Sequence, residues 1–278
     1  MPDTLNISNI GFQKTLRNEV VCDGIGLHSG KRTKINILPS DVNTGINFIR
    51  KDLENNQKIV ASYKNVSDTK LGTTLENEAG HKVHTIEHLM SAFMGLKIDN
   101  ALVILSGSEI PIMDGSARVF IDLINSAGIK EQFAQKKVIK ILKEVSFVQN
   151  NSSITIYPSD QFSIDYMIDF KDPAIGIQRQ KITLLANNFD KEIGSARTFG
   201  MLNEVEYMHK NGLALGGSIN NAIVVDNGKI LNPDGLRYKD EFVRHKILDL
   251  CGDIYLAGHH LIGNIVAECA GHEVNNKF

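Results

Sequence analysis

The sequence predicts an α+β fold of two similar domains, each a sheet with helices packed on one face, stacked with their helix layers facing. Two kinds of periodicity support this prediction. Apolar and polar residues alternate at residues 34–38 and 162–168, as they do in half-buried strands. Residues 83–96 and 240–257 instead place apolar side chains at helical spacing. Each half of the chain therefore combines a strand with a long apolar helix.

An echo between the two halves is the third observation. His88 precedes Gly95 by seven residues, His245 precedes Gly252 by seven, and a β-branched run follows each glycine. We infer an internal duplication from this echo. If the helix layers face each other, His88 and His245 meet at the junction, where pockets tend to form. The sequence therefore predicts an active site between the halves.

The first half is expected to begin with strands and to end in a helix. A valine pair at residues 20–21 leads into a glycine-rich turn at 24–30, and strand 34–38, helix 83–96 and buried strand 101–105 follow. A further helix opens at residues 115–116 and ends at Gly128, because glycine commonly terminates helices.

The second half repeats this order after a predicted linker. Residues 129–137 are polar and charged, which is typical of a linker, and they separate domain 1–131 from domain 137–278. The later elements are strand 162–168, helix 203–210, strand 222–225, helix 240–257 and strand 261–267.

Composition excludes several classes of protein. The 278 residues are 42% hydrophobic and 22% charged, as in ordinary globular proteins. A net charge of −2 predicts no nucleic-acid partner, and no apolar run approaches the ~18 residues of a membrane span. The three cysteines lack paired spacing, so we expect no disulfides. Together with a start that lacks a secretory signal, they predict a cytoplasmic protein.

The helix at residues 241–253 carries the most informative pattern. It places His245, Asp249 and Asp253 at intervals of four, so that their side chains share one helical face. His-x-x-x-Asp lets one helix supply two metal ligands, and His88 offers a third. Glu87 lies about 100° around its helix from His88, so it can stand beside a metal without binding it. Three ligands, an open position and a free carboxylate are the outline of a zinc hydrolase.

An alternative zinc site uses different ligands. Residues 84–88 match the H-x-x-E-H motif of inverted zinc peptidases, in which His84 and His88 both bind the metal and a distant glutamate is the third ligand. The motif fixes only three positions, and it leaves His245 and Asp249 without a role.

Longer strings of residues resemble one family throughout the chain. These strings are residues 24–31 (GIGLHSGK), 83–100 (VHTIEHLMSAFMGLKIDN), 109–117 (EIPIMDGSA), 195–200 (SARTFG), 241–253 (EFVRHKILDLCGD) and 270–276 (AGHEVNN). In this order they resemble the UDP-3-O-acyl-N-acetylglucosamine deacetylases, the zinc amidases that commit Gram-negative bacteria to lipid A synthesis.

The resemblance implies a reaction and a cofactor. The family hydrolyses the N-acetyl group of UDP-3-O-[(R)-3-hydroxyacyl]-N-acetylglucosamine and releases acetate. The resemblance assigns Zn²⁺ to His88, His245 and Asp249, and it makes Glu87 the general base. His272 matches a histidine that acts as general acid or as a cation near the oxyanion, Asp253 matches the carboxylate that holds this histidine, and Thr198 matches a hydroxyl beside the reacting oxygen.

The resemblance also implies where the substrate binds. Lys246 matches a lysine that contacts substrate. An insert at about residues 194–217 corresponds to a passage for the acyl chain, with Phe199, Met201, Leu215 and Gly217 as its expected contacts. His84 stands where the family has a small polar residue and Cys269 where a lysine often helps to hold the diphosphate, so neither role is transferred. We expect a monomer whose partner is this UDP-sugar.

Overall fold

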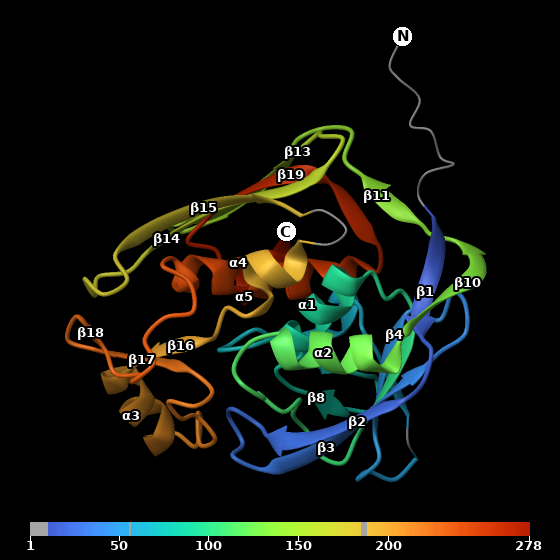
Figure 1. Ribbon diagram of the computed structural model, residues 1–278, viewed down its shortest axis with the longest axis horizontal. Coiled ribbons are helices and arrows are strands. Elements are labelled where there is room, and N and C mark those ends of the chain that lie inside the picture. The colour runs from blue at the N-terminus through green and yellow to red at the C-terminus, as the bar shows by residue number, and fades with distance from the viewer. Residues whose placement is uncertain (1–10, 56, 185–187) are drawn as a thin grey trace.

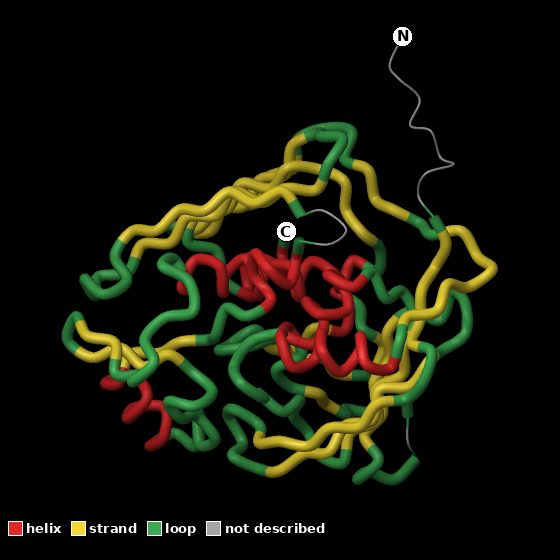
Figure 2. The backbone as a smooth tube through the Cα atoms, viewed as in Figure 1, coloured by secondary structure: helices red, strands yellow, loops and turns green. Residues whose placement is uncertain are grey.

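Two sheets enclose a layer of helices in the computed structural model, which describes residues 11–55, 57–184 and 188–278 (Figure 1). Figure 2 shows the helices other than α3 between the strands of the two sheets. The helices are α1 (Glu87–Leu96), α2 (Arg118–Ala127), α3 (Leu202–Lys210), α4 (Glu241–Ile254) and α5 (His272–Lys277), with short turns η2 (Tyr63–Asn65), η3 (Asp190–Gly194) and η4 (Tyr255–Ala257). The α+β prediction is confirmed.

The two large sheets share one topology. The first has the order β2 (Val20–Ile25), β3 (Arg32–Pro39), β9 (Ala101–Leu105), β4 (Ile46–Arg50) and β5 (Lys58–Val60). The second has the order β12 (Val145–Gln149), β13 (Ser152–Tyr157), β19 (His260–Glu268), β14 (Phe162–Asp169) and β15 (Ile177–Thr183), and β11 (Val138–Lys140) also pairs with β19. In both, the central strand follows a histidine-bearing helix and pairs antiparallel on one side and parallel on the other. This agreement supports the inferred duplication.

Three smaller sheets complete the fold. They are β1 (Phe12–Leu16) with β10 (Ile129–Gln135), β6 (Val66–Asp68) with β7 (Thr74–Glu76) and β8 (Lys82–Val83), and β16 (Phe199–Met201) with β17 (Ile223–Asp226) and β18 (Lys229–Ile230). The last sheet and α3 stand apart from the helix layer in Figure 1 and contain much of the predicted insert.

The helix at 83–96 begins later than predicted. Lys82–Val83 is strand β8, and Thr85 adopts a left-handed φ of 57°, so α1 begins only at Glu87. A β-branched residue rarely takes this conformation, and apolar periodicity carries no information about it. The predicted apolar stripe is nevertheless buried throughout: Ile86, Leu89, Met90, Phe93 and Met94.

The predicted linker is largely a strand. Residues 129–135 form β10, which pairs antiparallel with β1 more than a hundred residues upstream. Polar residues alternate there with half-buried ones because the two-stranded ribbon faces solvent on one side. The domain boundaries at 131 and 137 stay a prediction, and residues 1–10 of the first domain lie outside the described residues.

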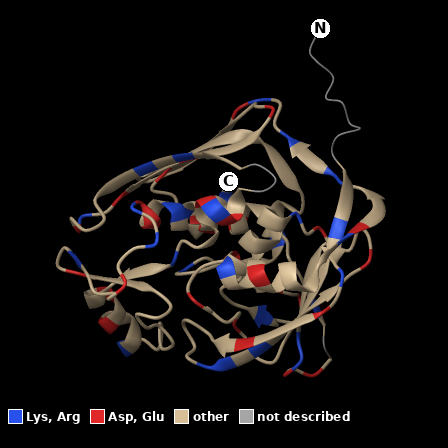
Figure 3. Cartoon of the chain, in the orientation of Figure 1, with Lys and Arg blue, Asp and Glu red and all other residues tan. Residues whose placement is uncertain are grey.

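The remaining predicted elements were found with small shifts. The strands at 34–38, 101–105, 162–168, 222–225 and 261–267 and the helices at 203–210 and 240–257 are all present. The predicted turn at 24–30 is partly strand, since β2 continues to Ile25, and the helix opening at 115–116 starts at Arg118. Within the described residues, no helix combines the length and apolarity that crossing a membrane requires. Figure 3 shows basic and acidic residues interspersed along the chain.

Candidate active site

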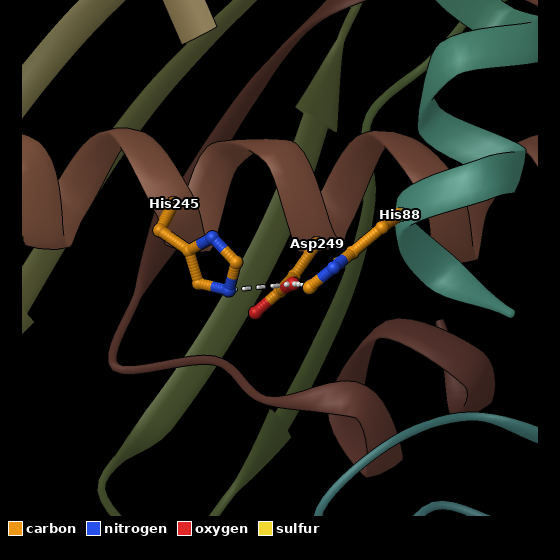
Figure 4. A group of neighbouring side chains, drawn as sticks. All are labelled: His88, His245 and Asp249. Carbon is orange, nitrogen blue, oxygen red and sulfur yellow. Dashed lines mark ion pairs between the residues drawn. The ribbon is translucent and has the colours of Figure 1, made fainter. Parts of the chain in front are cut away.

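Three predicted zinc ligands converge between α1 and α4 (Figure 4). Nε2 of His245 lies 3.3 Å and Nε2 of His88 lies 3.5 Å from the same oxygen, Oδ1 of Asp249. All three side chains are buried, and their candidate ligand atoms lie within 4.8 Å of one another. In the described parts of the chain, no other group of three or more His, Cys, Asp or Glu residues meets this condition.

The backbone around His245 selects the nitrogen that is available to a metal. Nδ1 of His245 lies 3.0 Å from the carbonyl oxygen of Ala196. A carbonyl oxygen can only accept a hydrogen bond, so Nδ1 carries the proton and Nε2 keeps its lone pair toward the cluster. Such a contact fixes the orientation of a metal-binding imidazole.

The charges of the cluster suit a divalent cation. Burial lowers the pKa of His245 to about 4, so the imidazole is neutral near pH 7 and can act as a ligand. Burial opposes the charge of Asp249, but His245 and Lys246 outweigh it and hold the pKa of Asp249 well below its usual value. Two imidazoles and one carboxylate are a donor set that zinc accepts in catalytic sites. The residues present therefore fit the implied metal.

Glu87 and His272 line the same cavity as the cluster, which has a volume of about 390 Å³. Burial raises the pKa of Glu87 above its ordinary value, although His272 and His88 oppose that shift. Burial also disfavours the charged form of His272, but Asp253 and Glu87 outweigh it and raise the pKa of His272 to about 9. The cavity thus joins a carboxylate of raised pKa to a histidine that is cationic at neutral pH.

Asp253 lies behind His272. Its Oδ2 accepts hydrogen bonds from Nδ1 of His272 and from Nδ2 of Asn275, both at 2.8 Å, and its Oδ1 accepts one from Oγ1 of Thr73 at 2.6 Å. Three donors, two of them from α5 and one from the loop before β7, therefore orient one buried carboxylate, as the predicted pairing of Asp253 with His272 requires.

Lys246 and three residues of the predicted insert also reach the cavity. Nζ of Lys246 lies 2.7 Å from Oδ2 of Asp249. Thr198, Phe199 and Met201 line the wall, and the Phe199 ring packs edge-on against Phe242 with 5.0 Å between ring centroids. These contacts bring the predicted substrate residues Lys246, Phe199 and Met201 next to the cluster.

Leu215 and Gly217 do not line this cavity. Leu215 is 52% exposed, and its backbone N–H donates to the carbonyl oxygen of His28. The N–H of Gly216 donates to the carbonyl oxygen of Leu27, which does line the cavity. This part of the predicted insert therefore meets the cavity only through the glycine-rich turn.

His84 is not part of the metal cluster. Its Nδ1 lies 2.9 Å from Oγ1 of Thr74, and its backbone forms a bridge with Glu109. The inverted-peptidase interpretation, which needs His84 and His88 as joint ligands, is not favoured by this geometry.

Sequence reasoning missed Thr73, the carbonyl group of Ala196, and Asn275. Thr73 lies far along the chain from Asp253 and Ala196 lies far from His245, and a carbonyl group is common to every residue, so neither contact has a signal in the sequence. Asn275 follows His272 by three positions in α5, a helical spacing that could have suggested a shared face.

Comparison with known proteins identifies the family. The family model for UDP-3-O-acyl N-acetylglycosamine deacetylase matches residues 13–278. A UDP-3-O-acyl-N-acetylglucosamine deacetylase of Pseudomonas entomophila is 49% identical over 268 residues, which are 96% of this chain and 88% of the relative. Proteins of the same name from Shewanella sp. W3-18-1 and Shewanella frigidimarina are 46% and 47% identical over 269 residues, with the same coverage of both chains. The chain therefore belongs to the UDP-3-O-acyl N-acetylglycosamine deacetylase family.

Proposed function

We propose that this protein hydrolyses the N-acetyl amide of a UDP-3-O-acyl-N-acetylglucosamine, releasing acetate in the committed step of lipid A biosynthesis. The names of its relatives support this substrate. One observation supports the chemistry most directly: the buried Glu87 carboxylate lines the same cavity as the convergent His88, His245 and Asp249. An amide hydrolase needs such a base beside a group that polarises the carbonyl.

Zn²⁺ is the proposed cofactor, held by His88, His245 and Asp249. A zinc ion with three protein ligands keeps one position open, acts as a Lewis acid and lowers the pKa of water to about 7. The neutral state of His245 and the ionised state of Asp249 support this assignment, since both residues bind metals in those forms.

Glu87 is the proposed general base. Its Oε2 accepts a hydrogen bond of 3.0 Å from the backbone N–H of Thr73, and among the described residues no donor contacts its Oε1. One oxygen is thus anchored while the other is free to take a proton from the attacking water. A raised pKa strengthens the carboxylate as a base near neutral pH.

His272 and Thr198 are proposed to stabilise the tetrahedral oxyanion. His272 lines the cavity as an imidazolium, because its pKa is about 9, and Thr198 offers a hydroxyl from the same wall. Donors already in position for developing charge stabilise a transition state more than the ground state. The departing amine then takes its proton either from His272 or from Glu87.

The substrate contacts are proposed from the cavity wall. Lys246 supplies a cation for the polar part of the substrate, while Phe199 and Met201 supply an apolar surface for the 3-O-acyl chain. Leu215 and Gly217 are proposed to contact the acyl chain beyond the cavity. A cytoplasmic location and a monomeric state stay predictions.

An acetate-release assay tests the proposed function. Purified protein is incubated with UDP-3-O-[(R)-3-hydroxyacyl]-N-acetylglucosamine, with and without a chelator, and metal content is measured by elemental analysis. We expect one zinc per chain and activity that the chelator abolishes and added zinc restores. Full activity in metal-free protein would refute the zinc mechanism, and a lack of activity in zinc-loaded protein would refute the proposed reaction.

A further inference from the structure

Thr73 contacts both proposed proton-transfer groups. It lies in the loop between β6 and β7 and is 1% exposed. Its backbone N–H donates to Oε2 of Glu87 at 3.0 Å, and its Oγ1 lies 2.6 Å from Oδ1 of Asp253 and 3.3 Å from Nδ1 of His272. The backbone of one residue therefore contacts the proposed base, and its side chain contacts the Asp253–His272 pair.

The chemistry of the partners fixes the direction of these hydrogen bonds. An ionised carboxylate can only accept, so the Thr73 hydroxyl donates its single proton to Asp253. Nδ1 of His272 donates to the other oxygen of Asp253 at 2.8 Å. Each oxygen of Asp253 thus has its own donor, and the carboxylate cannot rotate without losing one of these bonds. Hydrogen bonds to a charged group are among the stronger ones in proteins.

The backbone of the surrounding loop fixes the position of Thr73. Leu71 adopts a left-handed φ of 64°, and its carbonyl oxygen lies 3.0 Å from Nε2 of His28. Gly72 has φ 157°, and a Cβ atom there would lie 3.0 Å from Oε1 of Glu87. The carbonyl oxygen of Thr73 accepts from the N–H of Ile86, immediately before α1. Strained backbone of this kind persists where surrounding contacts over-determine it.

We propose that Thr73 is a positioning residue that sets the distance and orientation between Glu87 and the Asp253–His272 pair. This inference rests on the proposed function, because it acts through the roles given there to Glu87 and His272. Thr73 contacts neither the residues of the metal cluster nor the atoms that react in the proposed mechanism. Its hydroxyl acts through Asp253, whereas its backbone N–H acts through Glu87.

Two matched pairs of variants isolate the hydroxyl. Thr73→Val replaces it with a methyl group of similar size, and Thr73→Ser and Thr73→Ala both lack the threonine methyl but differ from each other by the hydroxyl. We expect kcat to fall roughly 10- to 100-fold in Thr73→Val, with KM within about 2-fold, which is the value of one hydrogen bond to a charged group expressed as a rate ratio. The kcat of Thr73→Ser should stay within about 3-fold of the wild-type value. The kcat of Thr73→Ala should be reduced about as much as that of Thr73→Val.

Thr74→Val is the control on the next residue. Thr74 is also buried, but its hydroxyl contacts Nδ1 of His84 rather than Asp253. We expect Thr74→Val to keep wild-type kcat and KM. All variants should keep the metal content of wild type, since Thr73 contacts none of the cluster residues.

A double-mutant cycle tests whether Thr73 acts through Asp253. On an Asp253→Asn background, the further change Thr73→Val should lower kcat less than about 2-fold, because the partner of the hydroxyl is already altered. Equal kcat in Thr73→Ser and Thr73→Ala, or equal kcat in Thr73→Val and Thr74→Val, would overturn the inference. If Thr73→Val fails to fold, the comparison of kcat between Thr73→Ser and Thr73→Ala tests the inference instead. An inactive wild-type protein would instead contradict the proposed function.

Discussion

Gly252 of α4 packs directly on the backbone of Glu87 in α1: a Cβ atom at position 252 would lie 2.1 Å from the Glu87 carbonyl oxygen. Real Cβ atoms do not approach this closely, so the two helices can touch at this point only because residue 252 has no side chain. The contact brings His88 to the same cavity as His245 and Asp249. The spacing between the helices is therefore part of the candidate metal site.

Gly252→Ala should consequently separate the two helices. We expect a loss of stability of about 1–3 kcal/mol, as for other overpacked cores, together with weaker zinc binding. Thermal melting and competitive zinc titration measure the two effects. Gly200→Ala is the control, because a Cβ there would meet Val205 at an ordinary 3.5 Å. Wild-type zinc affinity in Gly252→Ala would show that the cluster tolerates helix movement.

Glu87→Gln tests the division between base and ligands. We expect one zinc per chain, because Glu87 lies outside the cluster, and a fall in kcat of roughly 10²- to 10⁴-fold, the usual value of positioned acid–base catalysis. Metal analysis and steady-state kinetics on the same preparation measure both quantities. A collapse of zinc stoichiometry would mean that Glu87 is a ligand.

Zinc content should also distinguish His245 from His84. His245→Ala removes a cluster residue and should reduce zinc to well below one per chain. His84→Ala removes only the contact with Thr74, so its zinc content should equal that of wild type. Zinc loss in His84→Ala would revive the peptidase interpretation of residues 84–88.

The acyl chain should contribute strongly to kcat/KM. Burying one methylene group stabilises a complex by about 0.8 kcal/mol, and Phe199 and Met201 offer apolar surface beside the cluster. UDP-N-acetylglucosamine without the acyl group should therefore be a far poorer substrate, which an acetate-release assay with both compounds measures. Equal kcat/KM for the two would remove the acyl passage from the proposed function.

The sequence predicted those parts of the site that depend on local spacing. His245 and Asp249 share a helical face because they are four residues apart, and α4 forms where apolar periodicity predicts it. The glycine echo also has a physical basis in the structure. Gly252 packs on the backbone of Glu87, and a Cβ atom at Gly95 would lie 2.4 Å from the ring of Phe189, so neither position has room for a Cβ atom.

Contacts between distant segments could not be predicted in the same way. The polar and charged residues 129–137 predict a linker, because an edge strand can be as polar as a loop and the partner strand β1 lies more than a hundred residues upstream of β10. Thr73 meets Asp253 across 180 residues, and nothing in its immediate neighbourhood indicates this contact. The late start of α1 depends on the left-handed φ of Thr85. A β-branched residue disfavours this conformation, so the sequence does not predict it.

The pH dependence of kcat/KM should be bell-shaped, with His272 on the basic side. The proposed mechanism requires His272 to be protonated, and the pKa of His272 is raised to about 9, so activity should be retained at neutral pH and lost as the pH rises through about 9. On the acid side the base must be ionised. Because burial raises the pKa of Glu87, activity should be lost at a higher pH than an ordinary glutamate would give.

Asp253→Asn tests the assignment of the basic limb. Burial alone lowers a histidine pKa, and the negative charge of Asp253 is a main cause of the opposite shift in His272. Removing that charge should therefore move the basic limb to lower pH and reduce kcat, while zinc content stays near one per chain. His272→Ala should lower kcat more than it changes KM, because the cation matters most once charge develops on the oxyanion. It should also abolish the limb near pH 9. If the basic limb is unchanged in both variants, another group such as Lys246 sets it, and the role proposed for His272 must be withdrawn.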